Sequence, residues 1–265
     1  MTMNENLLID IDDRGIATVT LNRPQLHNAF NNELIADLRA AFLNLDGNPS
    51  VRAILLTGAG KSFSAGADLN WMKQSATFSA EENQEDAMRL SDMLSTINNC
   101  TKPTIAYVNG IAFGGGVGLT ACCDIAVTLS TAVFSLSEVK LGLTPATISP
   151  YVVRAIGERA ARRYFLTAER FDGIEARRIG LVHEIAHTDD EAQMIIEGLI
   201  GYLLSGGPIA QAASKSLIRM VTDTEITDAL RKRTAEHIAE RRTSDEGQEG
   251  LGAFLEKRKP NWSAE

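Results

Sequence analysis

Apolar runs and alternating patterns divide the first half of the chain into strands and helices. Leu7–Ile11 and Ile16–Leu21 flank the polar segment Asp12-Asp13-Arg14-Gly15, which predicts a β-hairpin. Further strands are expected at Val51–Thr57, Thr104–Val108, Ile125–Thr128 and Ala132–Ser135, and helices at Asn32–Leu45, Ala80–Asn98 and Gly116–Cys122. Repeated strand–turn–helix units of this kind predict an α/β core with parallel strands and right-handed crossovers.

After about residue 145 the pattern becomes helical. Helices are expected at Ile148–Ile156, Glu158–Thr167, Gly173–Ile179, Glu191–Leu204, Ile209–Val221, Glu225–Arg241 and Asp245–Lys257, with one strand at Leu181–Ile185. We therefore predict two parts. Residues 1–200 form the α/β core that carries the active site, and residues 201–265 form a C-terminal helical region.

Composition and charge narrow the class of protein. The chain has 265 residues, of which 44% are hydrophobic, and at this size about three-quarters of the unfolded surface can be buried. The net charge of −8 disfavours nucleic acid and anionic membranes as partners, because both repel an acidic surface. The sequence contains no stretch long enough for a membrane span, no signal-like start and no disulfide framework from Cys100, Cys122 and Cys123. A cytoplasmic location is expected.

Two turns and one carboxylate carry the candidate chemistry. The turn Phe63–Asp68 and the glycines Gly114–Gly116 each follow a predicted strand and precede a helix-compatible stretch. Backbone N–H groups at two helix starts can hold the negative oxygen of an enolate or tetrahedral intermediate, each for about 3–4 kcal/mol. Glycines alone are equally typical of ordinary turns, but Glu138 downstream adds a carboxylate for proton transfer. The combination predicts chemistry next to a carbonyl group.

Other motifs in the chain do not lead to a metal or nucleotide site. His183-Glu184-Ile185-Ala186-His187 matches the short zinc-protease pattern, which requires a helix. In the strand predicted here the two histidines would stand ~13 Å apart along the chain. Gly60-Lys61-Ser62 and Gly114–Gly118 lack the remaining glycines of the phosphate-loop and dinucleotide patterns. Neither a metal nor a flavin or nicotinamide cofactor is expected.

The motifs resemble those of a known family. The two turns, together with Cys123-Asp124-Ile125-Ala126 and Leu141–Pro145, resemble the enoyl-CoA hydratase/isomerase (crotonase) superfamily from about Leu8 to Trp262. Asp68–Met72 and Gly157–Tyr164 are most similar to the methylglutaconyl-CoA hydratase-type branch. The resemblance implies a crotonase-like spiral of ββα turns with a C-terminal helical trimerisation region, and hence a homotrimer or a dimer of trimers.

The resemblance also assigns site residues. The oxyanion donors fall on the backbone N–H groups of Ala67 and Gly115, and Glu138 falls on the second catalytic glutamate of the family pattern. Coenzyme A, as part of the substrate rather than as a cofactor, is expected along Ala29, Ala65, Asp68 and Leu69, with further contacts from Phe254 and Lys257. Lys257 also fits a solvated helix end equally well.

The sequence departs from the family pattern at one catalytic position. The first catalytic glutamate falls on Gly118, which has no carboxylate. Remaining alternatives are a hydratase using Glu138 with help from the substrate, a Δ3,Δ2-enoyl-CoA isomerase, a weak enzyme, and a non-catalytic binder of coenzyme A or RNA. The branch resemblance favours hydration of a branched, glutaconyl-type CoA ester, whose distal carboxylate can orient the water. The basic residue for that carboxylate is left open among Lys73, Lys140 and Arg154.

Overall fold

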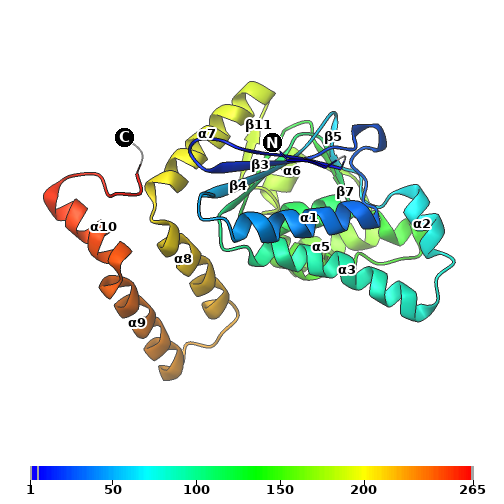
Figure 1. Ribbon diagram of the computed structural model, residues 1–265. Coiled ribbons are helices and arrows are strands. Elements are labelled where there is room, and N and C mark those ends of the chain that lie inside the picture. Colours follow the sequence, from blue (N-terminus) through cyan, green and yellow to red (C-terminus); the bar gives the residue numbers. More distant parts are fainter. Residues whose placement is uncertain (1, 5, 264–265) are drawn as a thin grey trace. The chain divides into compact units, whose positions relative to one another are not determined.

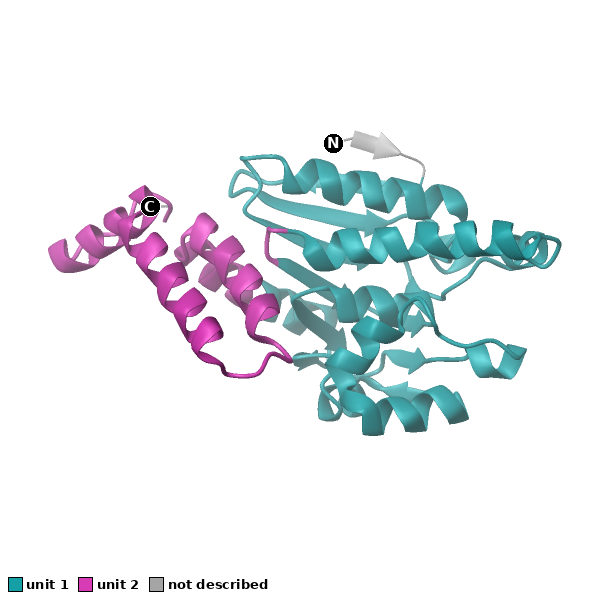
Figure 2. Cartoon of the chain, turned by 90° about the horizontal axis from the view of Figure 1, so that it is seen from below, with its two compact units in different colours: residues 1–100, 104–197 teal, residues 101–103, 198–265 magenta. Residues whose placement is uncertain are grey.

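The computed structural model describes residues 2–4 and 6–263 (Figure 1). The chain forms two compact units, which are residues 1–100 with 104–197 and residues 101–103 with 198–265 (Figure 2). The division in the second half of the chain falls within helix α7 (Asp189–Ser205). The roles predicted for the core and for the C-terminal region stay predictions.

A seven-stranded sheet forms the centre of the first unit, in the order β1-β2-β3-β4-β6-β8-β11. Its strands are β1 (Thr2–Asn4), β2 (Leu7–Ile11), β3 (Ile16–Leu21), β4 (Ala53–Gly58), β6 (Thr104–Val108), β8 (Ile125–Leu129) and β11 (Glu184–Ala186). The predicted hairpin is confirmed, with Leu7 opposite Leu21. From β3 to β11 all neighbours are parallel. The predicted α/β core with parallel strands is therefore confirmed.

A second sheet of four strands lies in the order β10-β9-β7-β5. Its strands are β5 (Ser62–Ser64), β7 (Ile111–Phe113), β9 (Val133–Ser135) and β10 (Phe171–Asp172). Three times in succession, a strand of the large sheet is followed by a short turn and a strand of the small sheet: β4 with β5, β6 with β7, and β8 with β9. The backbone thus repeats as ββα turns, although the sequence shows no repeat. Of these four strands only β9 was predicted, and all four have three residues or fewer, which is too short for a clear alternating pattern.

Helices accompany the two sheets. They are α1 (Asn32–Asp46), α2 (Leu69–Ser75), α3 (Ala80–Asn99), α4 (Gly115–Cys122), α5 (Ser149–Thr167) and α6 (Gly173–Arg178), with the 3-10 helices η1 (Pro24–Leu26) and η2 (Glu138–Leu141). Helices α1 and α3 lie side by side, and α4 packs against both α3 and α5 (Figure 1). Ser79 is the N-cap of α3 and forms a capping box with Glu82. Gly157, with φ 73° and ψ 159°, divides α5 into the two helices predicted from the sequence.

The second unit is helical, as the sequence predicts. It contains the end of α7, then α8 (Pro208–Val221), α9 (Asp228–Thr243) and α10 (Asp245–Glu256). The strand expected at Leu181–Ile185 is shifted to β11, because Leu181 and Val182 are instead buried in the turn that follows α6. No helix among the described residues is both long and apolar enough to cross a membrane.

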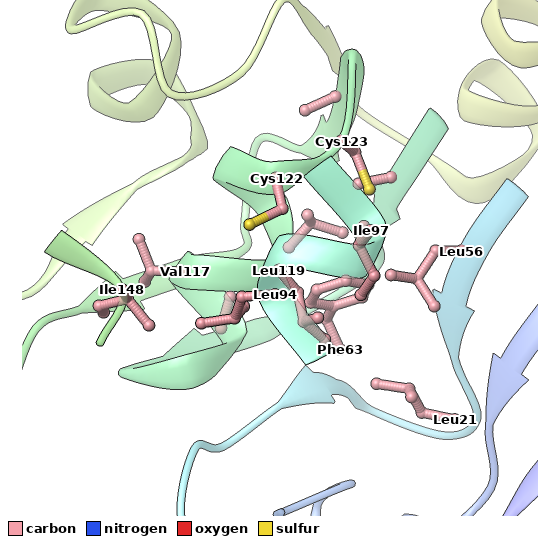
Figure 3. Close-up of a cluster of buried hydrophobic side chains, with 14 of the residues drawn as sticks. Leu21, Leu56, Phe63, Leu94, Ile97, Val117, Leu119, Cys122, Cys123 and Ile148 are labelled. Atoms are coloured by element: carbon pink, nitrogen blue, oxygen red, sulfur yellow. The ribbon is translucent and has the colours of Figure 1, made fainter. Parts of the chain in front are cut away.

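The hydrophobic core of the first unit lies directly beneath the two glycine-rich turns. Phe63 from β5, Leu94 from α3 and Leu119 from α4 are fully buried in it, and Ile148 joins them from the residue before α5 (Figure 3). Cys122 is also buried at the end of α4, as predicted. The turns that carry the candidate site are therefore attached to a rigid, closely packed base.

Candidate active site

The backbone N–H of Ala67 points away from Phe30, because the hydrogen bonds of the Phe30 backbone use the residues on either side of Ala67. Phe30 and Ala67 form an isolated parallel bridge. In this bridge the N–H of Phe30 donates to the Gly66 carbonyl at 2.6 Å, and the N–H of Asp68 donates to the Phe30 carbonyl at 2.8 Å. Both bonds use the residues on either side of Ala67, so its own N–H faces away from Phe30. Within the described residues this N–H has no backbone acceptor.

Gly115 supplies the second free amide. It is the first residue of α4, where N–H groups have no acceptor within the helix. The preceding Gly114 has φ 48°, a value that favours glycine, and its N–H donates to the Ser135 carbonyl at 2.9 Å. This bond ties the turn to the end of β9, the strand that leads to Glu138. The N–H of Gly115 therefore stands at the positive end of a helix whose start is fixed by the small sheet.

Phe30 connects the two donor segments, which the sequence did not reveal. A side chain added at Gly115 would place its Cβ 2.4 Å from Cε2 of the Phe30 ring. The ring of Phe30 thus packs on Gly115, while its backbone holds the residues around Ala67. The direction in which a side chain at position 115 would point is therefore occupied by the aromatic ring.

Glu138 lies beside the same turn. It is the first residue of η2, and a Cβ added at Gly114 would lie 2.9 Å from its Oε1. The other carboxyl oxygen, Oε2, is buried and has no hydrogen-bond partner among the described residues. Burial raises the pKa of Glu138, and a hydrogen bond from its own backbone N–H offsets only part of this effect. A carboxyl group whose pKa is raised in this way is better suited to giving and taking a proton than an exposed glutamate.

The residues expected to contact coenzyme A are placed as follows. The N–H of Ala65 donates to the His27 carbonyl at 2.9 Å and the N–H of Asp68 donates to Phe30, so these donors are already used. Ala29 is buried, and its carbonyl accepts from Arg23. Leu69, in contrast, is 73% exposed at the start of α2. Contacts with coenzyme A at these positions stay predictions and would use carbonyl groups and the Leu69 side chain.

Phe254 and Lys257 belong to the other unit. Phe254, in the last turn of α10, is 80% exposed, and Lys257 is the left-handed residue that ends this helix. The positions of the two units relative to one another are not determined. The predicted contact of these two residues with coenzyme A therefore stays a prediction.

Asp68 fixes the start of α2. Its carboxylate accepts the N–H of Asn70 at 2.7 Å and pairs with the Arg23 guanidinium at 3.0 Å. The two side chains are only 12% and 7% exposed, for Arg23 and Asp68 respectively. Burial alone would raise the pKa of Asp68, but the hydrogen bonds from Asn70 and Arg23 outweigh it and lower this pKa. The Asp68 carboxylate thus links Arg23 to the start of α2, next to Ala67.

Breaking the ion pair between Asp68 and Arg23 should destabilise the protein. We expect Asp68→Asn to lower the free energy of unfolding by about 3–5 kcal/mol at neutral pH, because the buried Arg23 charge loses its partner. The lowered pKa of Asp68 contributes stability above the ordinary aspartate range, and this contribution is lost as the pH falls. The difference between wild type and variant in urea unfolding should therefore shrink in acid. Arg14→Gln, which breaks an exposed pair with Glu197, is the control and should cost about 1 kcal/mol or less.

The basic residues considered for a distal substrate carboxylate do not converge on Glu138. The ammonium group of Lys140 donates to the Ala168 carbonyl at 2.8 Å. Lys73 on α2 and Arg154 on α5 are exposed. A cation not considered from the sequence, Arg170, lies 5.4 Å from the ring centre of Phe113, the residue before Gly114. The choice among these residues stays open.

The zinc-like motif folds as the sequence analysis expects. Glu184–Ala186 is strand β11 rather than a helix, and Nδ1 of His183 accepts the N–H of Ala126 at 3.0 Å. Nδ1 of His187 pairs with the Ser130 hydroxyl at 3.2 Å. The two histidines therefore have separate partners. Across the described part of the chain, no group of three His, Cys, Asp or Glu side chains is arranged to hold a metal ion.

Comparisons with known proteins show the family of this chain. The family model for enoyl-CoA hydratase/isomerase matches residues 12–265. The crystal structure of an enoyl-CoA hydratase from Shewanella pealeana is 45% identical and has a TM-score of 0.94, covering 97% of this chain and 96% of that chain. A crotonyl-CoA hydratase from Syntrophomonas wolfei is 34% identical over 260 residues, 97% of this chain and 98% of that protein. A short-chain-enoyl-CoA hydratase from Clostridium acetobutylicum is 32% identical over 96% of both proteins. The chain belongs to the enoyl-CoA hydratase/isomerase (crotonase) family.

Proposed function

We propose that this protein is a lyase that adds water to the double bond of a 2-enoyl-CoA thioester. The thioester oxygen would accept hydrogen bonds from the N–H groups of Ala67 and Gly115. These hydrogen bonds become stronger as the oxygen gains enolate charge. Glu138 would deliver a proton to C2 while the water oxygen bonds to C3. The proton that leaves the water replaces the one that Glu138 gives, so the carboxyl group returns to its starting form.

We further propose that the substrate is a branched, glutaconyl-type CoA ester. The observation that carries this proposal is that Glu138 lies beside Gly114 with a buried Oε2 that has no partner among the described residues, while position 118, the other catalytic position of the family pattern, is glycine. A water molecule near C3 therefore lacks the second protein carboxylate that would hold it. A glutaconyl-type ester carries its own carboxylate close to C3, and this group would accept a hydrogen bond from the attacking water.

A set of three esters tests this proposal. Methylglutaconyl-CoA has the branch and the carboxylate, 3-methylcrotonyl-CoA has the branch alone, and crotonyl-CoA has neither. We expect kcat/KM for hydration of the first to exceed that of the other two by at least about 10²-fold, since a polar group required by the reaction is missing from them. The hydration rate would be measured from the loss of enoyl absorbance, and the products would be identified by mass spectrometry. Equal rates on all three would contradict the proposed substrate class.

A second activity is consistent with a single carboxyl group. A Δ3,Δ2-enoyl-CoA isomerase moves one proton between C2 and C4, so one base beside the two donors is sufficient. The half-buried Glu138, whose pKa is raised by burial, supports this alternative as well. Incubation with a 3-enoyl-CoA distinguishes the two, because an isomerase yields the 2-enoyl ester without adding water. Product analysis by mass spectrometry shows the gain of water that only hydration gives.

We also propose that the protein assembles as a homotrimer or a dimer of trimers in the cytoplasm. Large apolar side chains are unusually exposed in the second unit, including Tyr202 at 79%, Ile226 at 82%, Phe254 at 80% and Leu255 at 78%. Such side chains are typical of surfaces that become covered on association. Light scattering at micromolar concentration should give the mass of three or six chains. A stable monomer would contradict this prediction.

A further inference from the structure

Glu138 lies beside Gly114, the residue before α4, and Ile148 lies beside Gly118 within α4. Gly114 and Gly118 are one helical turn apart, and the N–H of Gly118 donates to the Gly114 carbonyl at 3.2 Å. A Cβ at Gly114 would meet Oε1 of Glu138 at 2.9 Å, whereas a Cβ at Gly118 would meet Cγ2 of Ile148 at 2.4 Å and its Cβ at 2.9 Å. The side chain of Ile148 thus occupies the place that a side chain at position 118 would need.

Ile148 cannot easily give up this place. It is 2% exposed, and its carbonyl accepts the N–H groups of Tyr151 and Val152, both at 3.1 Å, at the start of α5. Its side chain belongs to the core cluster around α4, which also contains Leu94 (Figure 3). Leu94 lies 3.6 Å from the same added Cβ. Because the Ile148 backbone is bound and its surroundings are packed, the branched side chain has no free direction in which to turn.

We propose that Ile148 is a specificity-determining residue that keeps this site to one protein carboxylate. It fills the space next to Gly118 with a hydrocarbon group, so a carboxylate from position 118 cannot share with Glu138 in holding the attacking water. Enoyl esters without a carboxylate of their own are then poor substrates, an argument that rests on the proposed function. Gly118 and Ile148 are sterically complementary, so a carboxylate side chain cannot be introduced at either position without a change at the other.

A stability cycle tests the steric pairing without any substrate. Gly118→Ala should lower the melting temperature by about 5 °C or more, since the added methyl overlaps Ile148 in a packed core. With Ile148→Gly as the background, the same alanine should lower it by no more than about 1 °C. Ile148→Ala, which removes Cγ2, serves as a milder background. If Gly118→Ala lowers the melting temperature equally with and without the Ile148 side chain, the proposed steric pairing is wrong.

An activity comparison tests the consequence for specificity. The double variant G118E/I148G should hydrate crotonyl-CoA at least about tenfold faster than its matched control G118Q/I148G, which has the same bulk without a carboxylate. Gly118→Glu alone should be destabilised and should gain nothing. The inference is overturned if Gly118→Glu alone keeps the wild-type melting temperature and matches the double variant on crotonyl-CoA. It is also overturned if the folded double variant does not exceed the glutamine control.

These outcomes are separable from the proposed substrate class. If wild type hydrates crotonyl-CoA as fast as the glutaconyl-type ester, the substrate proposal fails on the wild-type measurement alone, and the claim that Ile148 sets specificity fails with it. The stability cycle still decides whether Ile148 excludes a side chain at position 118. If wild type prefers the carboxylated ester but the double variant does not gain on crotonyl-CoA, only the role of Ile148 is wrong.

Discussion

Glutamine in place of Glu138 should lower kcat for hydration by at least about 10²–10⁴-fold. The amide keeps the size of the carboxyl group but cannot give or take the proton at C2. The affinity for the CoA ester should change by less than about threefold, because the interaction lost is one made in the transition state. Steady-state kinetics and equilibrium binding of a saturated acyl-CoA would measure the two effects. Glu158→Gln, at an 80% exposed position on α5, is the matched control and should leave both unchanged.

The pH dependence gives an independent check on this role. Burial raises the pKa of Glu138, so the folded protein keeps this proton over a range in which the unfolded chain has lost it. The stability that comes from this group is therefore present at low pH and is lost as the pH rises through the raised pKa. The free energy of unfolding of wild type should fall relative to Glu138→Gln over that range. If the variant keeps most of its turnover on every ester and shows no such pH difference, Glu138 is structural.

The parts of this fold with strong local signals could be predicted from the sequence. The hairpin around Asp12–Gly15 and the helix that begins at Ser79 were confirmed because turn residues, caps and apolar periodicity lie within a few positions of each other. The same holds for Gly114, where glycine is required by the positive φ at the start of α4. The positions of the two turns and of Glu138 followed from their order along the chain.

The contacts that shape the site could not be predicted, because they join residues far apart in sequence. Phe30 meets Gly115, and Ile148 meets Gly118, only after the ββα turns have brought their elements together. In sequence Gly115 looks like a turn residue and Gly118 like a helix residue without a side chain, and the structure shows that a neighbouring side chain lies where a side chain at each position would be. The carboxylate of Asp68 likewise accepts from the Arg23 side chain, which is distant in sequence, and from the N–H of Asn70, while its contact with coenzyme A stays a prediction.

Alanine at Gly115 should reduce kcat by about 10²-fold or more, the cost typical of losing one oxyanion donor. The added methyl would lie 2.4 Å from Cε2 of Phe30, so either the ring or the start of α4 must move. Phe30 is 1% exposed and its backbone is bonded to Gly66 and Asp68, so the ring has little freedom. The start of α4 is then displaced, and with it the N–H of Gly115. A displacement of about 1 Å is enough to lower the rate by this amount.

A second substitution separates this mechanism from general misfolding. Phe30→Leu removes the part of the ring that the methyl meets, and the double variant G115A/F30L should recover kcat by at least about tenfold over Gly115→Ala. Gly47→Ala, at the end of α1 where an added Cβ has only ordinary contacts, is the matched control and should keep full activity. Circular dichroism and thermal unfolding would confirm that each variant is folded. Undiminished kcat in a folded Gly115→Ala would remove this amide from the catalytic site. Loss of kcat without recovery in the double variant would mean that the methyl group itself blocks the thioester, rather than acting through Phe30.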